Sequence, residues 1–281
     1  MTTITGPGLF PDVPEDVYHA DPVEGGSLSS SGSKLIIESP AKYRWAADNP
    51  SPSTAAQALG SAAHRVVLGS GPEIEEIDAA DWRTKKAKEA KAEAEAAGKI
   101  PVLAKDFERV KAMADALREH PLAGPLLDPD GGSAEQTIVW DDPESGVRCR
   151  ARLDWLRDAP DGGRSLVPDY KTARSAAPDA FGKSVYDYGY HQQACHYLDG
   201  VNALNLGVDP SFLFIVQETE PPHLVAVYQL DAQTMAAGRA RNRWARQVYA
   251  ECTANDDWPG YPPDVHAVSI PTWALRREGI L

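Results

Sequence analysis

The chain has 281 residues, of which 42% are hydrophobic and 25% are charged. This composition is typical of a globular protein with a real core and excludes a disordered chain. No apolar run approaches the roughly 20 residues that cross a bilayer, and the first ten residues lack the basic start and apolar stretch of a signal peptide. We therefore expect a cytoplasmic protein with no membrane partner. Three scattered cysteines indicate neither a disulfide framework nor a zinc or iron–sulfur site.

The formal net charge of −13 argues against a nucleic-acid partner, because affinity for DNA comes largely from Lys and Arg. This charge does not exclude DNA, since a channel can be locally basic on an acidic protein and bound metal ions offset carboxylates. The length suits one α/β domain over residues 1–281.

The first half of the chain is predicted to be mainly helical, with an irregular segment over residues 1–27 and a core over residues 28–252. Leu28 to Gly32, a serine-rich stretch, precedes Leu35 and Ile36 and predicts a short serine-capped helix that ends before Pro40. The other elements expected here are a loop over Asn49–Thr54, a helix over Ala55–Leu68, a charged helix over Thr84–Ala97 and a helix over Leu103–Leu117 with one buried face. For the charged helix, solvent exposure is the main interpretation and DNA contact the alternative.

The second half changes to strands and then returns to helices. Alternating residues predict a hairpin, followed by a Pro/Gly/Asp turn over Ala159–Gly163, further strands and helices, and a tail over residues 253–281 that packs on the core. The predicted strands are Glu135–Trp140, Val147–Leu156, Leu166–Lys171, Phe212–Gln217 and Leu224–Leu230. The predicted helices are Pro178–Tyr186, His191–Leu204 and Ala232–Cys252, the last with a buried stripe of Ala236, Ala240, Trp244 and Val248. Together these elements predict an α/β fold with a central mixed β-sheet flanked by α-helices.

Two of the predicted strands bring carboxylates and cations onto common faces. Because side chains alternate along a strand, Asp154 shares one face of the second hairpin strand with a basic row, which consists of Arg148, Arg150 and Arg152. In the next strand, Asp169 and Lys171 point to the same side. Carboxylate oxygens suit Mg²⁺, for which Mn²⁺ can substitute, and a neighbouring lysine can orient a water molecule or stabilise charge on a phosphate.

Each of these patterns has a structural alternative. An Asp-X-Lys tripeptide is common, and a surface ion pair would explain it. The basic row either binds phosphates or forms a solvated face balanced by acidic residues, and the sequence leaves both open. Arg174, just beyond Lys171, is a candidate phosphate ligand. Glu135, on the first hairpin strand, either contacts a metal-bound water or faces solvent.

The order and spacing of four motifs resemble the PD-(D/E)XK nuclease superfamily, in particular the branch of RecB-like nuclease domains and RecE-type exonucleases of phages and prophages. Asp154 closes a hairpin strand 15 residues before Asp169-Tyr170-Lys171. Upstream, Gly60 and His64 form a Gly-x-x-x-His motif; downstream, Gln193 and Tyr197 form a Gln-x-x-x-Tyr motif. Shorter stretches, Tyr188-Gly189-Tyr190 among them, extend the resemblance from Leu28 to Trp273.

The resemblance implies a restriction-endonuclease-like fold and a role for each matching residue. It implies that Asp154, Asp169, His64 and the carbonyl of Tyr170 bind Mg²⁺, that Lys171 is the catalytic lysine, and that Gln193 and Tyr197 contact DNA or support the motif. One irregularity is Pro168, which lacks the N–H that a central strand would use and suggests a bulge.

The resemblance also implies an activity and partners. It implies an exonuclease that degrades one strand from linear duplex ends, 5′ to 3′, in phage-type homologous recombination inside a bacterial host cell. A single-strand annealing protein would be its partner, and the enzyme would be a ring-shaped homo-oligomer. The competing readings are a single-strand DNA nuclease of the same branch and a non-catalytic DNA-binding scaffold.

Overall fold

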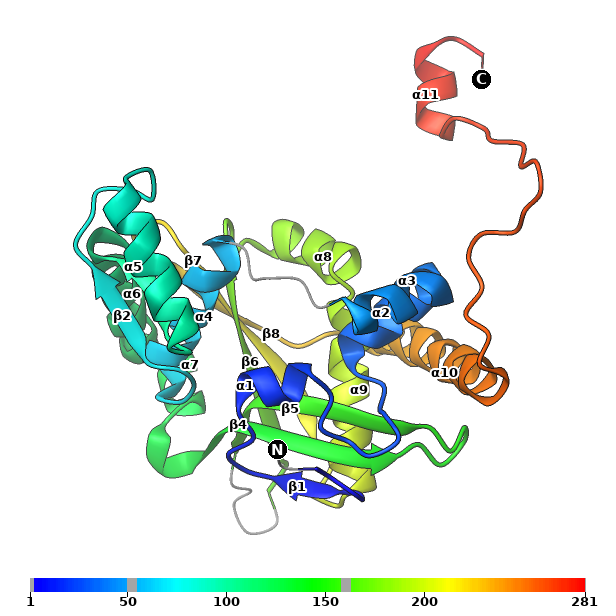
Figure 1. Cartoon of the computed structure of the whole chain (residues 1–281), viewed down its shortest axis with the longest axis horizontal. Coiled ribbons are helices and arrows are strands. Elements are labelled where there is room, and N and C mark those ends of the chain that lie inside the picture. The colour runs from blue at the N-terminus through cyan, green and yellow to red at the C-terminus, as the bar shows by residue number, and fades with distance from the viewer. Residues whose placement is uncertain (1–2, 50–54, 158–162, 281) are drawn as a thin grey trace.

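Two three-stranded sheets lie next to each other at the centre of the molecule (Figure 1). The computed structural model describes residues 3–49, 55–157 and 163–280; the predicted turn over Ala159–Gly163 and the loop over Asn49–Thr54 lie almost wholly outside them. The first sheet is antiparallel, in the order β1 (Gly8–Phe10), β4 (Gly132–Asp141) and β5 (Arg148–Arg157). The second has the order β6 (Leu166–Ala173), β7 (Ser211–Glu218) and β8 (Val225–Tyr228), with β6 parallel to β7 and β7 antiparallel to β8. A small parallel pair, β2 (Ile74–Ile77) and β3 (Ile100–Leu103), forms a third sheet.

Helices cover both faces of these sheets, so the predicted α/β class is confirmed. One apolar core lies between β4 to β7 and the helices α2 (Ser30–Glu38), α8 (Pro178–Asp187), α9 (Tyr190–Ala203) and α10 (Ala232–Asn255). A second core lies on the opposite face, under α4 (Ala55–Leu68), α6 (Ala104–Glu119) and α7 (Ala123–Leu126). The remaining helical elements are α1 (Glu15–His19), α3 (Pro40–Asp48), α5 (Lys85–Ala96), the 3-10 turn Pro129–Gly131 and α11 (Thr272–Arg277). None of the helices in the described ranges is long and apolar enough to span a membrane.

The expected single sheet is interrupted between β5 and β6, where the described residues form no backbone ladder. The N–H of Tyr170 instead donates to a side-chain oxygen of Asp154, at 2.9 Å. Backbone N–H groups point to alternate sides of a strand, so the nitrogen of Pro168 faces the same neighbour as that of Tyr170. Proline has no hydrogen to donate there. The missing N–H donor at Pro168 is therefore accommodated by a break in the ladder between β5 and β6, and not by the bulge that the sequence suggested.

Two segments were predicted incompletely. Residues 1–27 are not simply irregular: β1 pairs with β4, and Val13, Tyr18 and Val23 are buried against Val139. The serine-capped helix expected to end before Pro40 is confirmed as α2, which ends at Glu38; Pro40 itself begins a further helix, α3, where a proline costs no hydrogen bond. The short strands β2 and β3 were missed, since four residues each give too little alternation to detect.

The predicted buried stripe of α10 is wrong. Trp244 is 49% exposed, and the buried positions are Gly238, Asn242, Ala245, Arg246, Tyr249 and Cys252. The size of the side chains explains which face of α10 packs against α9. A Cβ placed on Gly238 would lie 2.3 Å from the carbonyl oxygen of His191, so only a glycine permits this close approach of α10 to α9. The side chain of Asn242 then donates to the carbonyl oxygen of Gln192, at 2.8 Å.

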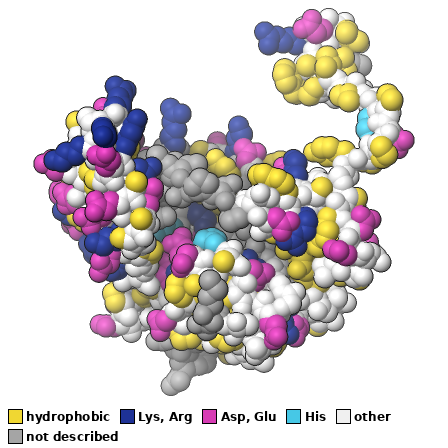
Figure 2. Space-filling view, viewed as in Figure 1, with side chains coloured by type: hydrophobic (Ala, Val, Ile, Leu, Met, Phe, Trp, Pro, Cys, Tyr) yellow, Lys and Arg dark blue, Asp and Glu magenta, His cyan; other side chains and the backbone are white. Residues whose placement is uncertain are grey.

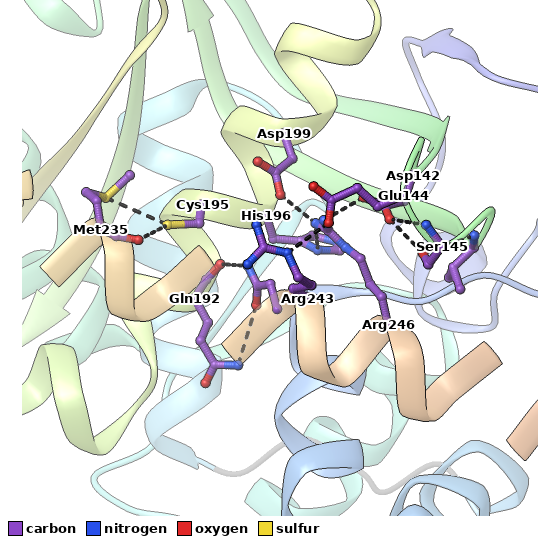
Figure 3. Close-up of polar contacts among 12 residues, drawn as sticks. Asp142, Glu144, Ser145, Gln192, Cys195, His196, Asp199, Met235, Arg243 and Arg246 are labelled. Atoms are coloured by element: carbon purple, nitrogen blue, oxygen red, sulfur yellow. Dashed lines mark hydrogen bonds and ion pairs between the residues drawn. The ribbon is translucent and has the colours of Figure 1, made fainter. Parts of the chain in front are cut away.

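A buried ionic cluster holds α9 and α10 against the β4–β5 hairpin (Figure 3). The guanidinium of Arg246 donates to Asp142 at 2.7 Å and to Asp199 at 2.6 Å. One turn before Asp199 on α9, the Nε2 atom of His196 lies 3.0 Å from the carbonyl oxygen of Arg150. These contacts set the position of α9, the helix that carries Gln193 and Tyr197.

The C-terminal tail departs from its expected packing on the core. Its first residues do pack: the ring of Trp258 stacks on Tyr43 at 5.4 Å, and the carbonyl oxygen of Pro259 accepts from the N–H of Ala41 at 3.2 Å. Beyond them the chain is exposed almost throughout, with Trp273 at 69%. Figure 1 shows this part running away from the sheets to α11.

Candidate active site

The predicted carboxylates and lysine lie around the break between the two sheets. Asp169 and Lys171 point to the same side of β6, as alternation predicts, with the ammonium nitrogen 2.6 Å from a carboxylate oxygen of Asp169. The side-chain amide of Gln193 donates to the other oxygen of Asp169, at 2.8 Å. Asp169 is 1% exposed. Its carboxylate is thus held between a helix and its own strand.

Asp154 reaches the same region from β5. One of its oxygens accepts from the N–H of Tyr170 and lies 3.7 Å from the Nδ1 atom of His64, which α4 contributes from the opposite face. The side chain of Tyr170 turns into the core, where its hydroxyl donates to Gln217 at 2.6 Å, and its ring lies 5.1 Å from that of His64. The structure therefore brings together residues from β5, β6, α4 and α9.

Burial sets the protonation of these groups. Burial, followed by the neighbouring Asp154 carboxylate, raises the pKa of Asp169 to about 6, although Lys171 opposes the shift. Burial likewise raises the pKa of Asp154. For His64, burial and then the charge of Lys171 lower the pKa to about 4, so its imidazole is neutral at pH 7 and keeps a free lone pair. Two neighbouring carboxylates that repel each other, one of them buried, favour an additional positive charge.

The donor atoms fit a hard divalent cation in type. Carboxylate oxygens are the preferred ligands of Mg²⁺ and Mn²⁺, and a neutral imidazole is a compatible additional donor. Their present arrangement is not a closed metal site: within the described ranges, no three His, Cys, Asp or Glu side chains converge closely enough to hold an ion. The Asp169 oxygens are instead engaged by Lys171 and Gln193.

Several of these residues line a cleft of about 320 Å³. His64, Asp154, Lys171, Gln193 and Tyr197 form its floor and wall, and α1 contributes Glu15, Tyr18 and His19 to the rim. Tyr197 is half-buried, and burial raises its pKa well above the usual value. Figure 2 shows acidic and histidine side chains gathered around a hollow on this face. The N-terminal segment, predicted to be irregular, thus contributes directly to the site.

The basic row is engaged in internal contacts. Arg148 pairs with Asp141. Arg150 is 8% exposed, lies 2.8 Å from Asp21 and donates to the carbonyl oxygen of Ser27 at 2.7 Å. Arg148 and Arg150 were expected to bind phosphates, and this expectation is corrected. Each of them is instead balanced by a carboxylate, as the alternative interpretation held.

The third arginine of the row, Arg152, lines the cleft but is also paired with a carboxylate. Arg152 pairs with Glu135 of β4 and donates to the carbonyl oxygen of Val13 at 2.9 Å. Burial, then the Asp154 carboxylate, raises the pKa of Glu135 to about 7. Glu135 therefore does not simply face solvent. Arg174 is exposed just beyond β6 and, among the described residues, enters no ion pair.

Two further residues lie at the site: Lys34, which was not singled out from the sequence, and Tyr190, which was named only within the Tyr188-Gly189-Tyr190 stretch. The ammonium of Lys171 lies 5.4 Å from the centroid of the Tyr190 ring, and that of Lys34, from α2, lies 6.0 Å from the same centroid. Burial and the nearby Lys171 charge lower the pKa of Lys34 to about 8. Tyr190 carried a signal through the Tyr188-Gly189-Tyr190 stretch, but nothing local in the sequence connects Lys34 to a site 137 positions downstream.

Comparison with known proteins identifies the family and the fold of the chain. The model of a family described as "PDDEXK-like domain of unknown function (DUF3799)" matches residues 29–268. A solved structure from Eubacterium rectale, of a protein named as a candidate exonuclease, aligns over 95% of this chain and 98% of its own, with 12% identity and a TM-score of 0.59. At that identity the likeness concerns the fold alone. The structure named SSO0001 aligns over 68% of this chain and 87% of its own, with 16% identity, but its TM-score of 0.27 carries no argument. No curated protein matches the chain.

Proposed function

Since the chain belongs to the family of PDDEXK-like domains, we propose that it is a metal-dependent DNA nuclease with Asp154, Asp169 and Lys171 as its catalytic centre. One observation carries the proposal: the ammonium of Lys171 pairs with the buried carboxylate of Asp169 and lines a cleft together with a second carboxylate, Asp154, and a neutral imidazole. A surface ion pair would not be 1% exposed at its carboxylate, nor would it be held by a glutamine from another helix.

Each residue has a defined part in the proposed hydrolysis. Asp154, Asp169, His64 and the Tyr170 carbonyl would hold Mg²⁺, or Mn²⁺ in its place. A bound cation would supply Lewis acidity and a more acidic water. Lys171 orients the attacking water and offsets charge that develops on the phosphate. Gln193 fixes the orientation of Asp169, and Tyr197 lines the space in which the DNA strand lies.

We further propose the specific activity that the motif resemblance implies. The enzyme would act on linear duplex ends and degrade one strand 5′ to 3′, as a RecE-type exonuclease of phage-type recombination. It would work as a homo-oligomer with a single-strand annealing protein. The four ordered motifs support this assignment, as does the fold shared with a protein named as a candidate exonuclease. A monomeric mass in light scattering at working concentration would contradict the homo-oligomer.

One experiment separates this activity from its alternatives. Wild-type protein is incubated with blunt linear duplex, nicked circular duplex and single-stranded DNA, each with Mg²⁺ and with EDTA. We expect only the linear duplex to be degraded, and only with the metal. Degradation of the single strand alone would favour the single-strand nuclease, and binding without hydrolysis would favour the scaffold.

A matched pair of lysine variants tests the catalytic assignment. Lys171→Met keeps the aliphatic stem and removes the charge, and it should lower kcat by roughly 10²- to 10³-fold, the usual effect of losing one group that stabilises transition-state charge. Lys183→Met, at an exposed position of α8, should leave kcat unchanged. Equal activity of the two variants would remove Lys171 from the mechanism.

A further inference from the structure

An exposed aromatic strip, Tyr186 and Tyr188, lies at the turn between α8 and α9, next to the Tyr190 ring that contacts Lys171. Tyr186 is 72% exposed and Tyr188 is 62% exposed, whereas most aromatic rings of this protein lie in the two cores. The turn is fixed by Gly189, whose φ of +63° is a left-handed conformation that favours glycine. The two rings are therefore held at the surface by the backbone rather than left there by a loose loop.

The strip is connected to the catalytic lysine through a single ring. Tyr188 lies 5.6 Å from Tyr190 between ring centroids, and the Tyr190 ring in turn lies 5.4 Å from the ammonium nitrogen of Lys171. A path of two contacts thus leads from the proposed site of phosphate hydrolysis to an exposed aromatic face. A phosphate at Lys171 would place the adjoining nucleotide within reach of that face.

Lys34 adds positive charge at the same place. Its ammonium lies 6.0 Å from the Tyr190 centroid, and a Cβ placed on Gly189 would come within 3.0 Å of its Cε, so the glycine also makes room for the lysine stem. Within the described ranges Lys34 forms no ion pair with a carboxylate, unlike Arg148, Arg150 and Arg152. Lys34 is therefore a cation beside the Tyr190 ring that can meet a phosphate.

We propose that Tyr188 and Lys34 form a subsite for one unpaired nucleotide next to the scissile phosphate, with the base stacked on Tyr188 and the backbone phosphate at Lys34. This proposal rests on the proposed nuclease function. An aromatic ring accepts any base, because every base presents a π-face, and a cation beside it follows the backbone. The subsite would hold a strand after it has separated from its complement, without preference for sequence.

Substitution of Tyr188 tests the stacking. The measurements are KM and kcat on linear duplex with a short single-stranded end, and the affinity for a labelled single strand in EDTA. Tyr188→Ala should raise KM and weaken binding about 5- to 150-fold, the range that corresponds to loss of one base–aromatic stack, with kcat little changed. Tyr188→Phe keeps the ring and should stay close to wild type. Tyr261→Ala, at a 74% exposed tyrosine of the tail, is the matched control.

Changes in the DNA substrate provide a second, independent test of stacking on Tyr188. A series of strands with one abasic position each should show a single position at which the missing base weakens binding by wild type but not by Tyr188→Ala. Lys34→Ala should lower the slope of the logarithm of the binding constant against the logarithm of the salt concentration by about 1, which corresponds to the loss of one phosphate contact. Lys34→Arg should preserve this slope.

The outcomes separate this proposal from the nuclease function itself. If wild type degrades DNA and Tyr188→Ala behaves like Tyr261→Ala, the subsite is refuted while the nuclease function stands. If Tyr188→Phe is as impaired as Tyr188→Ala, the ring does not stack on a base. If wild type neither binds nor degrades any DNA, both proposals fail, and the exposed tyrosines would then point to a protein partner.

Discussion

The ionic cluster around Arg246 should be one of the most sensitive positions in the fold. The side chain of Arg246 is 7% exposed and pairs with Asp142, which is 9% exposed, and with Asp199, which is 30% exposed. Replacement by Met keeps most of the side-chain volume but leaves a buried carboxylate without its cation. Breaking a buried ion pair from one side costs about 3–5 kcal/mol. Ser145 still donates two hydrogen bonds to Asp142 in the variant, so we expect the lower end, about 3 kcal/mol.

A neighbouring arginine on the same helix provides the control. Arg243 also pairs with a carboxylate, Glu144 at 2.8 Å (Figure 3), but both side chains are more than half exposed. Solvent-exposed pairs contribute about 0–1 kcal/mol, so Arg243→Met should be nearly neutral. The free energy of unfolding is measured by urea titration with circular dichroism. A loss below about 1 kcal/mol in Arg246→Met, or equal losses in the two variants, would refute the argument from burial.

Three further outcomes follow from contacts elsewhere in the chain. Gly238→Ala should destabilise the protein by about 1–3 kcal/mol because its Cβ would press on the carbonyl of His191; a gain of stability in thermal melts, expected from helix propensity alone, would contradict this. Burial, then the Arg246 charge, lowers the pKa of His196 to about 3, whereas an unfolded histidine titrates near 6.5. As the pH falls, the unfolded chain therefore takes up the proton first. The contribution of neutral His196 to the free energy of unfolding is lost as the pH falls from about 6.5 towards 3. At pH 5 that loss is about 2 kcal/mol, and urea midpoints at pH 7.5 and 5.0 should differ less in His196→Gln than in wild type; an unchanged difference would remove His196 from the acid response. Gln193→Ala should lower nuclease activity about 10- to 100-fold, since Gln193 orients Asp169, while substitution of an exposed glutamine of α10 should not; equal rates would assign Gln193 no supporting role.

Local periodicity was sufficient where a single strand determines the arrangement. Alternation placed Asp169 and Lys171 on one side of β6, and the structure brings the ammonium within 2.6 Å of the carboxylate. The same rule placed Arg150 on the face of Asp154 but could not show what lies over that face. Its partners, Asp21 and Ser27, come from more than 120 positions upstream, in a segment without a recognisable pattern. Whether an arginine is free or paired with a carboxylate depends on residues that are distant in the sequence. The sequence alone therefore could not decide whether the basic row binds phosphates or is balanced by acidic residues.

Helix α10 shows a different limit. A spacing of four residues correctly predicted a long helix, but the same spacing fits several stripes on its surface. Hydropathy favoured the stripe with Trp244, whereas close packing on α9 selected the stripe that begins at Gly238. The size of the side chain, rather than its apolar character, decided the face in contact. Such a preference becomes visible only when the neighbouring helix is known.

The break between β5 and β6 connects the fold to the chemistry. A continuous sheet would satisfy the N–H of Tyr170 with a backbone carbonyl and would leave no reason for a carboxylate to enter the space between the strands. Because Pro168 cannot donate on that side, the ladder is already weakened, and the Asp154 side chain serves as the acceptor for Tyr170. The carboxylate is thereby held beside Asp169 and His64, buried but not committed to a regular backbone partner. The same proline that made a central strand doubtful from the sequence therefore accounts for how two buried acids come to lie at one point of the fold.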